Sequence, residues 1–172
     1  VYREAVRRYV LALGRAFKDH PAVIGWQLDN EIEHKVNRIC YNPACERAWH
    51  EWLKKTYRTA DEFNQRLLLV SWGMKVSTLD KVPLPGHPVD RALPALRLAN
   101  LHFRRDTILT FFSEQTRALR EAGVKDWITT DWNTYFTALA DDPLARQSLD
   151  VASLNFYQPS AENADFWDTL AW

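Results

Sequence analysis

The sequence predicts an α/β protein in which helices alternate with the strands of a parallel sheet, as part of a TIM, or (β/α)8, barrel. Helical and strand patterns alternate along the chain, which is typical of βα units. The first predicted strand is a continuous apolar run, as in sheets that are covered on both faces. All three predicted strands end in polar or aromatic residues, and a TIM barrel builds its active site at the carboxyl ends of its strands.

The composition is that of a globular domain without a polyanionic partner. The chain has 172 residues, enough for one domain with a sizeable core, and 47% of them are hydrophobic. Lys and Arg number 22, and Asp and Glu also number 22, so no excess of positive charge favours nucleic acid. No apolar run approaches the roughly 20 residues of a membrane span. Aromatic residues make up 13% of the chain and serve either a large core or faces on which sugar rings stack.

The first helix is predicted over residues 1–18. Its apolar residues recur at spacings of four, three and four, which places them on one face of a helix. These residues are Val6, Val10, Leu13 and Phe17. Pro21 ends the connection, and residues 22–28 follow as the first strand.

A pair of shorter helices is predicted next. Asn42 is a good N-cap and Pro43 suits the first helical position. Thr59 and Glu62 have the spacing of a capping box for the second helix of the pair. The first of these helices has a candidate buried face. Its members are Trp49, Trp52, Leu53 and Tyr57.

The second half of the chain begins with a segment rich in proline, at about 70–95, which predicts a loop or an excursion. Residues 94–122 then form the longest helical pattern, and Gly123 is its expected end. The apolar residues of this pattern are Leu101, Ile108, Phe112, Leu119 and Ala122. Two further strands are predicted at 127–130 and 151–156, with a short helix or turn between them.

The three predicted strands end in similar groups of residues. These groups are Asp29-Asn30-Glu31, Asp131-Trp132-Asn133 and Asn155-Phe156-Tyr157. One strand that ends in Asp or Asn is weak support for a site, because these residues also begin turns. Three such ends favour a barrel-like site.

Glu31 is the best catalytic candidate at these strand ends. Apolar and aromatic surroundings would raise the pKa of its carboxyl group, which suits a general acid near neutral pH. An ionised Asp29 nearby would add to this effect, but a regular strand is needed to place both carboxyl groups on the same side. From the residues alone, Glu31 could equally be an acid in the first turn of a following helix.

Several stretches of the chain match the motifs of one known family. They are "HPAVIGWQLDNE" at residues 20–31, "WHEWLKKTYRTADEFNQ" at 49–65, "ANLHFRRDTILTFFSEQTRALRE" at 99–121 and "SLDVASLNFYQP" at 148–159. In that order they resemble the strand-four motif, a helix pair, a long helix and the sixth strand of glycoside hydrolase family 42, the β-galactosidases. The likeness extends over almost the whole chain.

The resemblance implies a (β/α)8 barrel of which the chain carries about strands four to six with their helices. It also implies retaining hydrolysis of terminal β-D-galactosides. Glu31 would be the acid/base, and Asn30 would hydrogen-bond the 2-hydroxyl group of the sugar. Tyr157 would line the sugar site near the nucleophile, and Trp132 and Asn133 would line the same site.

Retaining glycosidases use two carboxyl groups roughly 5 Å apart. The family nucleophile is a Glu at the end of strand seven, and the resemblance places Trp172 after strand six. The chain also begins with Val1 inside a predicted helix, and its only Met is Met74. We therefore expect a piece of one catalytic barrel domain, residues 1–172, that carries the acid/base but lacks the nucleophile. In isolation it should have little or no hydrolase activity.

The resemblance also bears on metal binding and on substrate detail. The family's cysteine cluster commonly reads C-x-C-x-x-C and belongs to a zinc site, whereas "CYNPAC" keeps Cys40 and Cys45 and has Asn42 in the middle place. Two thiolates are too few for a closed structural zinc site, so we expect no required cofactor. Cys40 and Cys45 are the candidate ligands if zinc binds. Asp131 stands where the family usually has Asn, and "SLNFY" varies the family's W-D-x-Y.

Two alternatives are open. Related retaining barrel families also end strand four in Asn-Glu and act on other β-glycosides, and a non-catalytic carbohydrate-binding barrel would use the same aromatic strand ends. The expected partner is a galactoside, with neither nucleic acid nor membrane. The resemblance further implies a homotrimer and a cytoplasmic location in bacteria.

Overall fold

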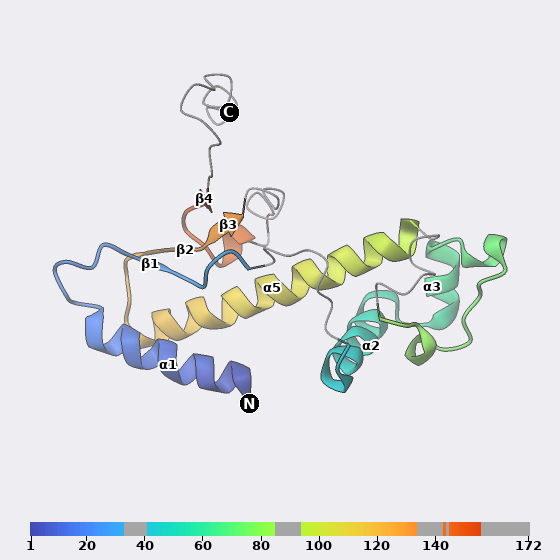
Figure 1. Ribbon diagram of the computed structural model, residues 1–172, viewed down its shortest axis with the longest axis horizontal. Helices are drawn as coiled ribbons and strands as arrows, with labels where there is room; N and C mark the ends of the chain where they lie inside the picture. The colour runs from blue at the N-terminus through green and yellow to red at the C-terminus, as the bar shows by residue number, and fades with distance from the viewer. Residues whose placement is uncertain (33–40, 85–93, 134–142, 144, 156–172) are drawn as a thin grey trace, which may run out of the picture. The chain divides into compact units, whose positions relative to one another are not determined.

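The structure is a computed structural model of the chain, and Figure 1 traces its helices and strands. The residues that it describes are 1–32, 41–84, 94–133, 143 and 145–155. The chain divides into two compact units. The strand unit comprises Val1–His34 and Phe111–Trp172, and the helical unit comprises Lys35–Thr110. Helices and parallel strand pairs are both present, so the predicted α/β class is confirmed.

Within the strand unit, helix α1 lies close to the second half of helix α5. Helix α1 runs over Tyr2–Phe17, and α5 runs over Pro94–Ala122. A Cβ atom added at Gly14 would lie 2.7 Å from the Cβ of Ala122, so the two helices approach too closely for a larger residue at position 14. Phe17 is the last residue of α1 and is 44% exposed, so this member of the predicted apolar face is not buried.

Four short strands complete the strand unit. They are β1 (Gly25–Gln27), β2 (Trp127–Thr129), β3 (Asp131–Asn133) and β4 (Ser153–Asn155). Strand β1 pairs in parallel with β2, and β3 pairs in parallel with β4. Only Thr130 separates β2 from β3, so one extended segment pairs with β1 over its first part and with β4 over its second. The parallel pairing brings the ends of these strands to one edge.

The first strand is shorter than predicted. Residues 22–28 were expected to be extended, whereas β1 covers Gly25–Gln27. The backbone then turns out of the strand, because Asp29 and Glu31 have φ angles of 51° and 45°. This left-handed region disfavours residues with a Cβ atom, so the conformation costs about 1–3 kcal/mol at each residue and needs support from its surroundings.

The helical unit contains the predicted helix pair. Helix α2 runs over Pro43–Tyr57 and α3 over Ala60–Arg66. The Asn42 side chain accepts hydrogen bonds from the backbone of Ala44 and Cys45, and the Thr59 hydroxyl accepts one from the backbone of Glu62. The predicted N-cap at Asn42 is therefore confirmed. Thr59 caps α3, but the expected capping box is incomplete, because the Thr59 N–H donates to the carbonyl of Tyr57 and the Glu62 carboxylate accepts from Arg66. The short 3-10 helices η1 (Leu69–Trp72) and η2 (Leu79–Lys81) follow.

An aromatic and aliphatic core holds the helical unit together. Trp49, Leu53 and Phe63 are fully buried. The indole N–H of Trp49 donates to the backbone carbonyl of Val82 at 3.2 Å, so the core also fixes the chain that follows η2. Of the proline-rich stretch expected at 70–95, residues 85–93 lie outside the described residues. The described part contains the end of η1 and all of η2, and its Leu79, Val82 and Leu84 belong to the core. The expectation of one barrel domain stays a prediction.

Helix α5 confirms the long helix predicted from residue 94 to 122, and Gly123 follows it with a φ angle of 96°. Within the helical unit, Leu96 and Ala99 are buried, whereas Leu101 is 45% exposed. The other members of the predicted apolar repeat are buried, so the repeat fails to bury only its first member, Leu101.

Candidate active site

The candidate site begins where β1 ends, and neighbouring backbone and hydroxyl groups hold this end in place. The N–H of Leu28 donates to the carbonyl of Thr129 at 2.7 Å, which extends the β1–β2 pairing by one residue. The Thr130 hydroxyl donates to the carbonyl of Leu28 at 2.5 Å, and Thr130 is fully buried. The residue that separates β2 from β3 therefore also supports the backbone just before the site.

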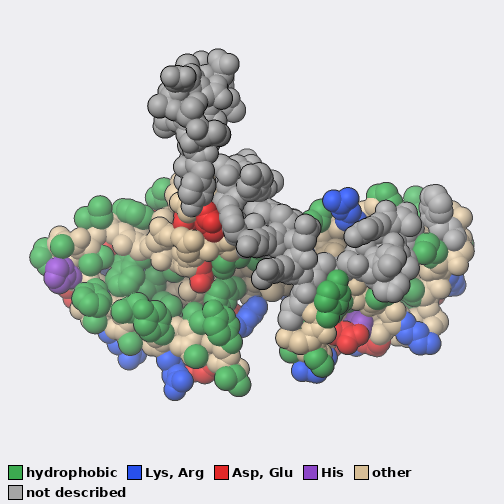
Figure 2. All heavy atoms as spheres, viewed as in Figure 1, with side chains coloured by type: hydrophobic (Ala, Val, Ile, Leu, Met, Phe, Trp, Pro, Cys, Tyr) green, Lys and Arg blue, Asp and Glu red, His purple; other side chains and the backbone are tan. Residues whose placement is uncertain are grey.

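Glu31 lies beside Asp131, the first residue of β3, and Asn155, the last residue of β4. Its backbone N–H lies 3.2 Å from two oxygens of Asp131, the carbonyl oxygen and Oδ1 of the side chain. Its own carboxyl oxygen Oε1 accepts a hydrogen bond from the Asn155 amide nitrogen Nδ2 at 3.0 Å. Figure 2 shows a group of acidic side chains over this part of the molecule. Glu31 is half-buried, so its carboxyl group is partly accessible while its position is fixed.

Asp29 and Glu31 have different partners. The Asp29 oxygen Oδ2 accepts a hydrogen bond at 2.6 Å from the amide nitrogen of Gln115 on helix α5, whereas Glu31 bonds to Asn155 on β4. The irregular backbone at these two residues removes the alternation that would place their side chains on one side. The condition under which Asp29 and Glu31 would lie on the same side, a regular strand, is therefore not met.

The other predicted substrate contacts have different surroundings. Asn30 is exposed between the two left-handed residues. Trp132 is fully buried, and its ring packs edge-on against Phe112 of α5 with centroids 5.4 Å apart. Asn133 is the last residue of β3 and lies opposite Asn155 in the register. Tyr157 lies outside the described residues. A sugar contact by these side chains stays a prediction.

The predicted metal ligands lie at the start of α2. Cys45 is in the first turn of this helix and packs against the core of the helical unit. Cys40 lies outside the described residues. Among the residues that the structure does describe, no three His, Cys, Asp or Glu side chains come together in a way that could hold a metal ion. Zinc binding by the two cysteines stays a prediction.

The structure adds Asp131, Asn155 and Gln115 to the residues that sequence reasoning singled out. Asp131 and Asn155 belong to the strand ends that were recognised as a group, but no role was given to either. The available signal was their place at the ends of neighbouring strands, where parallel pairing brings side chains together. Gln115 had no such signal. It lies in a long helix and is 5% exposed, so only the fold brings it to Asp29.

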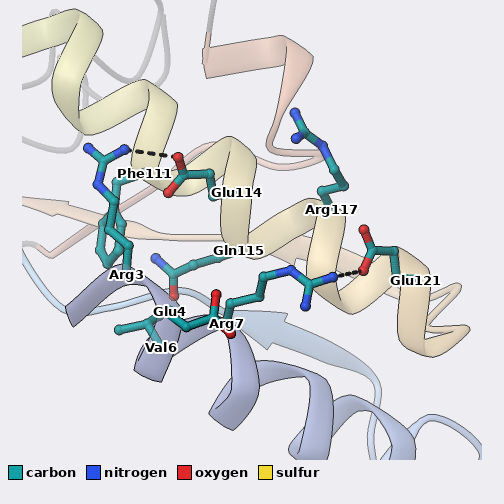
Figure 3. Close-up of a pocket in the computed structure, with 9 residues that line it drawn as sticks. All are labelled: Arg3, Glu4, Val6, Arg7, Phe111, Glu114, Gln115, Arg117 and Glu121. Atoms are coloured by element: carbon teal, nitrogen blue, oxygen red, sulfur yellow. Dashed lines mark hydrogen bonds and ion pairs between the residues drawn. The ribbon is translucent and has the colours of Figure 1, made fainter. Parts of the chain in front are cut away.

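A second concave region lies between α1 and the second half of α5 (Figure 3). This groove has a volume of about 300 Å³ and is lined mainly by charged side chains. Two ion pairs, Arg3–Glu114 and Arg7–Glu121, join its walls. Since these charges neutralise one another, we do not assign the groove as the reaction centre.

No helix in the described ranges is long and apolar enough to cross a membrane. The polar groups instead gather where parallel strands end, with a half-buried carboxyl group among amide and carboxylate partners. Helices, parallel strand pairs and polar strand ends are also features of TIM-barrel enzymes.

Comparisons with known proteins agree with this class. The sequence profile of the family described as "Beta-galactosidase", glycoside hydrolase family 42, matches residues 1–169. A relative, beta-galactosidase BgaA of Thermus sp, is 33% identical over 156 residues, which are 91% of this chain and 24% of the relative. The β-galactosidase of Thermus thermophilus is 32% identical over 157 residues, 91% of this chain and 24% of that protein.

Solved structures agree as well. The β-galactosidase from the psychrophilic Marinomonas ef1 matches with a TM-score of 0.80 and 31% identity, over 96% of this chain and 26% of that one. The chain therefore belongs to glycoside hydrolase family 42, the β-galactosidase family. It spans about a quarter of the length of the relatives that it matches.

Proposed function

We propose that this chain carries the acid/base part of a retaining β-galactosidase that hydrolyses terminal β-D-galactosides, with Glu31 as the acid/base. The observation that carries the proposal is the position of Glu31 in a chain of this family. It follows β1, it is half-buried, and its carboxyl group is held by Asn155 at the end of a neighbouring parallel strand. The names of the relatives favour galactosides over other β-glycosides.

The proposed reaction uses the Glu31 carboxyl group twice. In the first step its protonated form gives a proton to the glycosidic oxygen as the bond to the anomeric carbon breaks. In the second step the carboxylate takes a proton from the water that releases the sugar. The exposed Asn30 side chain would hydrogen-bond the 2-hydroxyl group of the sugar beside the anomeric carbon.

A retaining mechanism also needs a nucleophilic carboxylate roughly 5 Å from the acid/base. We assign this role to no described residue. The chain spans about a quarter of its relatives, and we propose that the nucleophile belongs to a part of the protein that the chain does not span.

The test is the variant Glu31→Gln in the protein expressed from its complete open reading frame. For lactose or an alkyl β-galactoside, whose leaving groups need a proton, kcat/KM should fall by about 10²–10⁴-fold. For 2,4-dinitrophenyl β-galactoside, whose leaving group departs without a proton, kcat/KM should change little. Added azide should restore turnover of the activated substrate, because an anion can replace water without a general base.

A matched control is Glu114→Gln, which removes a carboxylate of the same unit that pairs with Arg3 on the helix surface. This variant should keep kcat/KM for both substrates within about twofold, since a surface ion pair contributes little. Equal losses of kcat/KM on both substrates in Glu31→Gln would contradict the acid/base role.

A further inference from the structure

The backbone of Glu31 is held in an unfavourable conformation. Its φ angle is 45°, in the region that residues with a Cβ atom avoid. A glutamate there returns to a commoner conformation unless neighbouring groups hold it. One group that holds it is Asp131, whose backbone carbonyl and side-chain Oδ1 both lie 3.2 Å from the Glu31 nitrogen.

Asp131 is suited to hold the Glu31 N–H. When it is ionised, its carboxyl group has acceptors and no donor. An asparagine amide in the same place could instead turn its own N–H groups towards the Glu31 N–H. A hydrogen bond to a carboxylate is also roughly twice as strong as one between neutral groups. Asp131 is 6% exposed, so packing limits the positions that its side chain can adopt.

The carboxyl group of Glu31 has a separate anchor. Asn155 donates from Nδ2 to Oε1 at 3.0 Å. A glutamate side chain has several rotatable bonds, and this contact restricts the end that would carry out proton transfer. Position 155 therefore needs a hydrogen-bond donor, whereas position 131 needs an acceptor. An amide can donate to a carboxylate, and a second carboxylate cannot.

The two anchors are fixed relative to each other. Asp131 lies opposite Ser153 in the parallel pairing of β3 and β4, two residues before Asn155. The Ser153 hydroxyl donates to the carbonyl of Thr130 at 2.7 Å, and the Thr129 hydroxyl donates to the carbonyl of Val151 at 2.6 Å. These side-chain bonds stabilise the register between the two strands.

We propose that Asp131 and Asn155 are a pair of positioning residues for Glu31, with Asp131 fixing its backbone and Asn155 fixing its carboxyl group. The proposal rests on the acid/base role of Glu31. The pair places the proton-carrying oxygens where the glycosidic oxygen departs, so its loss should affect only the steps that need proton transfer. Small displacements of a catalytic group can cost about a hundredfold in rate.

The first test uses Asn155→Ala and Asn155→Leu in the protein expressed from its complete open reading frame. The leucine variant keeps nearly the size of the side chain and removes the donor without adding a charge, so it covers the case in which the alanine variant does not fold. Both should lower kcat/KM for an alkyl β-galactoside by about 10–100-fold, because a displaced catalytic group can cost up to about a hundredfold in rate. Both should leave kcat/KM for 2,4-dinitrophenyl β-galactoside within about threefold.

The second test uses Asp131→Ala and Asp131→Asn. The alanine variant removes the side-chain acceptor and should lower kcat/KM for the alkyl substrate by about tenfold, again with little change for the activated one. The asparagine variant keeps an acceptor oxygen in the same place and should recover most of this loss. Gln147→Ala, at an exposed residue of the short helix η4 (Ala145–Gln147), is the matched control and should not alter either value.

The outcomes separate this proposal from the one before it. If Glu31→Gln shows no dependence on the leaving group, the acid/base role itself is wrong. If Glu31→Gln shows that dependence but the Asn155 and Asp131 variants lose activity equally on both substrates, or lose none, the positioning role is overturned and the acid/base role stands.

Discussion

The strand unit and the helical unit use different residues to hold their structures. In the strand unit, polar side chains with low exposure support the end of β1: Gln115 and Asp131 are 5% and 6% exposed, and Thr130 is fully buried. In the helical unit, aromatic rings supply the core, with Trp49 stacked on Trp52 at 5.5 Å and Tyr57 edge-on to Phe63 at 5.1 Å. Directional hydrogen bonds hold the end of β1 in a strained conformation, whereas apolar burial stabilises the core of the helical unit.

The two units are therefore sensitive to different kinds of substitution. Apolar packing loses free energy in proportion to the volume removed, whatever the direction of the contact. A hydrogen-bonded turn is instead sensitive to single atoms, because a buried donor or acceptor that loses its partner is costly. Substitutions in the helical unit should therefore lower stability alone, and substitutions at the strand ends should alter the proposed proton transfer.

The largest expected effect on stability is that of Trp49→Ala. Trp49 is fully buried, and removing its ring leaves a cavity in the core of the helical unit, at a cost of about 3–5 kcal/mol. Amide hydrogen exchange of peptides from α2 and α3 in the full-length protein should report this loss as easier opening.

The control for Trp49→Ala is Lys55→Ala, on the exposed side of the same helix, which should leave exchange unchanged. In Trp49→Ala molecules that stay folded, the ratio of kcat/KM between alkyl and activated galactosides should equal that of the parent. A changed ratio would mean that a substitution in the helical unit also alters the proposed proton transfer, which would contradict the distinction between the two units.

An intermediate effect is expected for Thr130→Val. Valine has nearly the shape of threonine but cannot donate to the Leu28 carbonyl, which the Thr130 hydroxyl contacts at 2.5 Å. A lost partner for a buried acceptor costs about 1–3 kcal/mol. Amide exchange should become faster around residues 25–31 and stay the same in α2.

Thr130→Ser keeps the hydroxyl group and is the matched control for this variant. It should protect residues 25–31 better than Thr130→Val does. If serine and valine give equal exchange rates, packing of the threonine methyl group, and not its hydrogen bond, supports the end of β1.

The smallest effect is expected for the surface pair Lys54–Asp80, which joins α2 to η2 at 2.8 Å. The hydrogen bond from Lys54 lowers the pKa of the Asp80 carboxyl from its ordinary 3.8, and the same bond raises the pKa of the Lys54 amine from its ordinary 10.5. The ion pair therefore stabilises the folded protein fully at pH values between these two ordinary pKa values. It is lost as the pH falls through the lowered pKa of Asp80, or rises through the raised pKa of Lys54.

Asp80→Asn should lower the thermal unfolding midpoint slightly at neutral pH and low salt, and the difference from the parent should shrink in strong acid. At about 1 M salt, screening should also reduce it. Asp61→Asn, which removes a longer ion pair with Lys75 at 3.5 Å, is the comparison and should change the midpoint less. A difference that is independent of both pH and salt would mean that the pair does not act through charge.

Local signals made much of the fold predictable. The caps at Asn42 and Thr59 and the helix end at Gly123 depend on a few adjacent residues, and the structure confirms all three. The end of the first strand was less predictable. The apolar run continues through Leu28, but contacts with residues 100 positions away, such as Asp131, set the backbone at Glu31.

The candidate site was predictable to a similar extent. Its place at the strand ends, and Glu31 as its central carboxyl group, followed from the pattern and from the family resemblance. The partners of Glu31 did not, since hydrogen bonds between side chains on different strands leave no mark in a linear pattern. The burial of Trp132 was not predictable either. Its neighbours in the sequence are polar, whereas its ring packs on Phe112 of α5.

The division of one extended segment into β2 and β3 bears on the order of folding. Asp131 and Ser153 are paired across 22 positions of the chain, whereas Gly25 and Trp127 are paired across 102. Closing the longer loop costs about 1 kcal/mol more in chain entropy, so the β3–β4 pair has the advantage in forming first. The strand pair that carries Asp131 and Asn155 then forms before β1 joins it. Docking of β1 is the step that brings Glu31 into contact with these two residues.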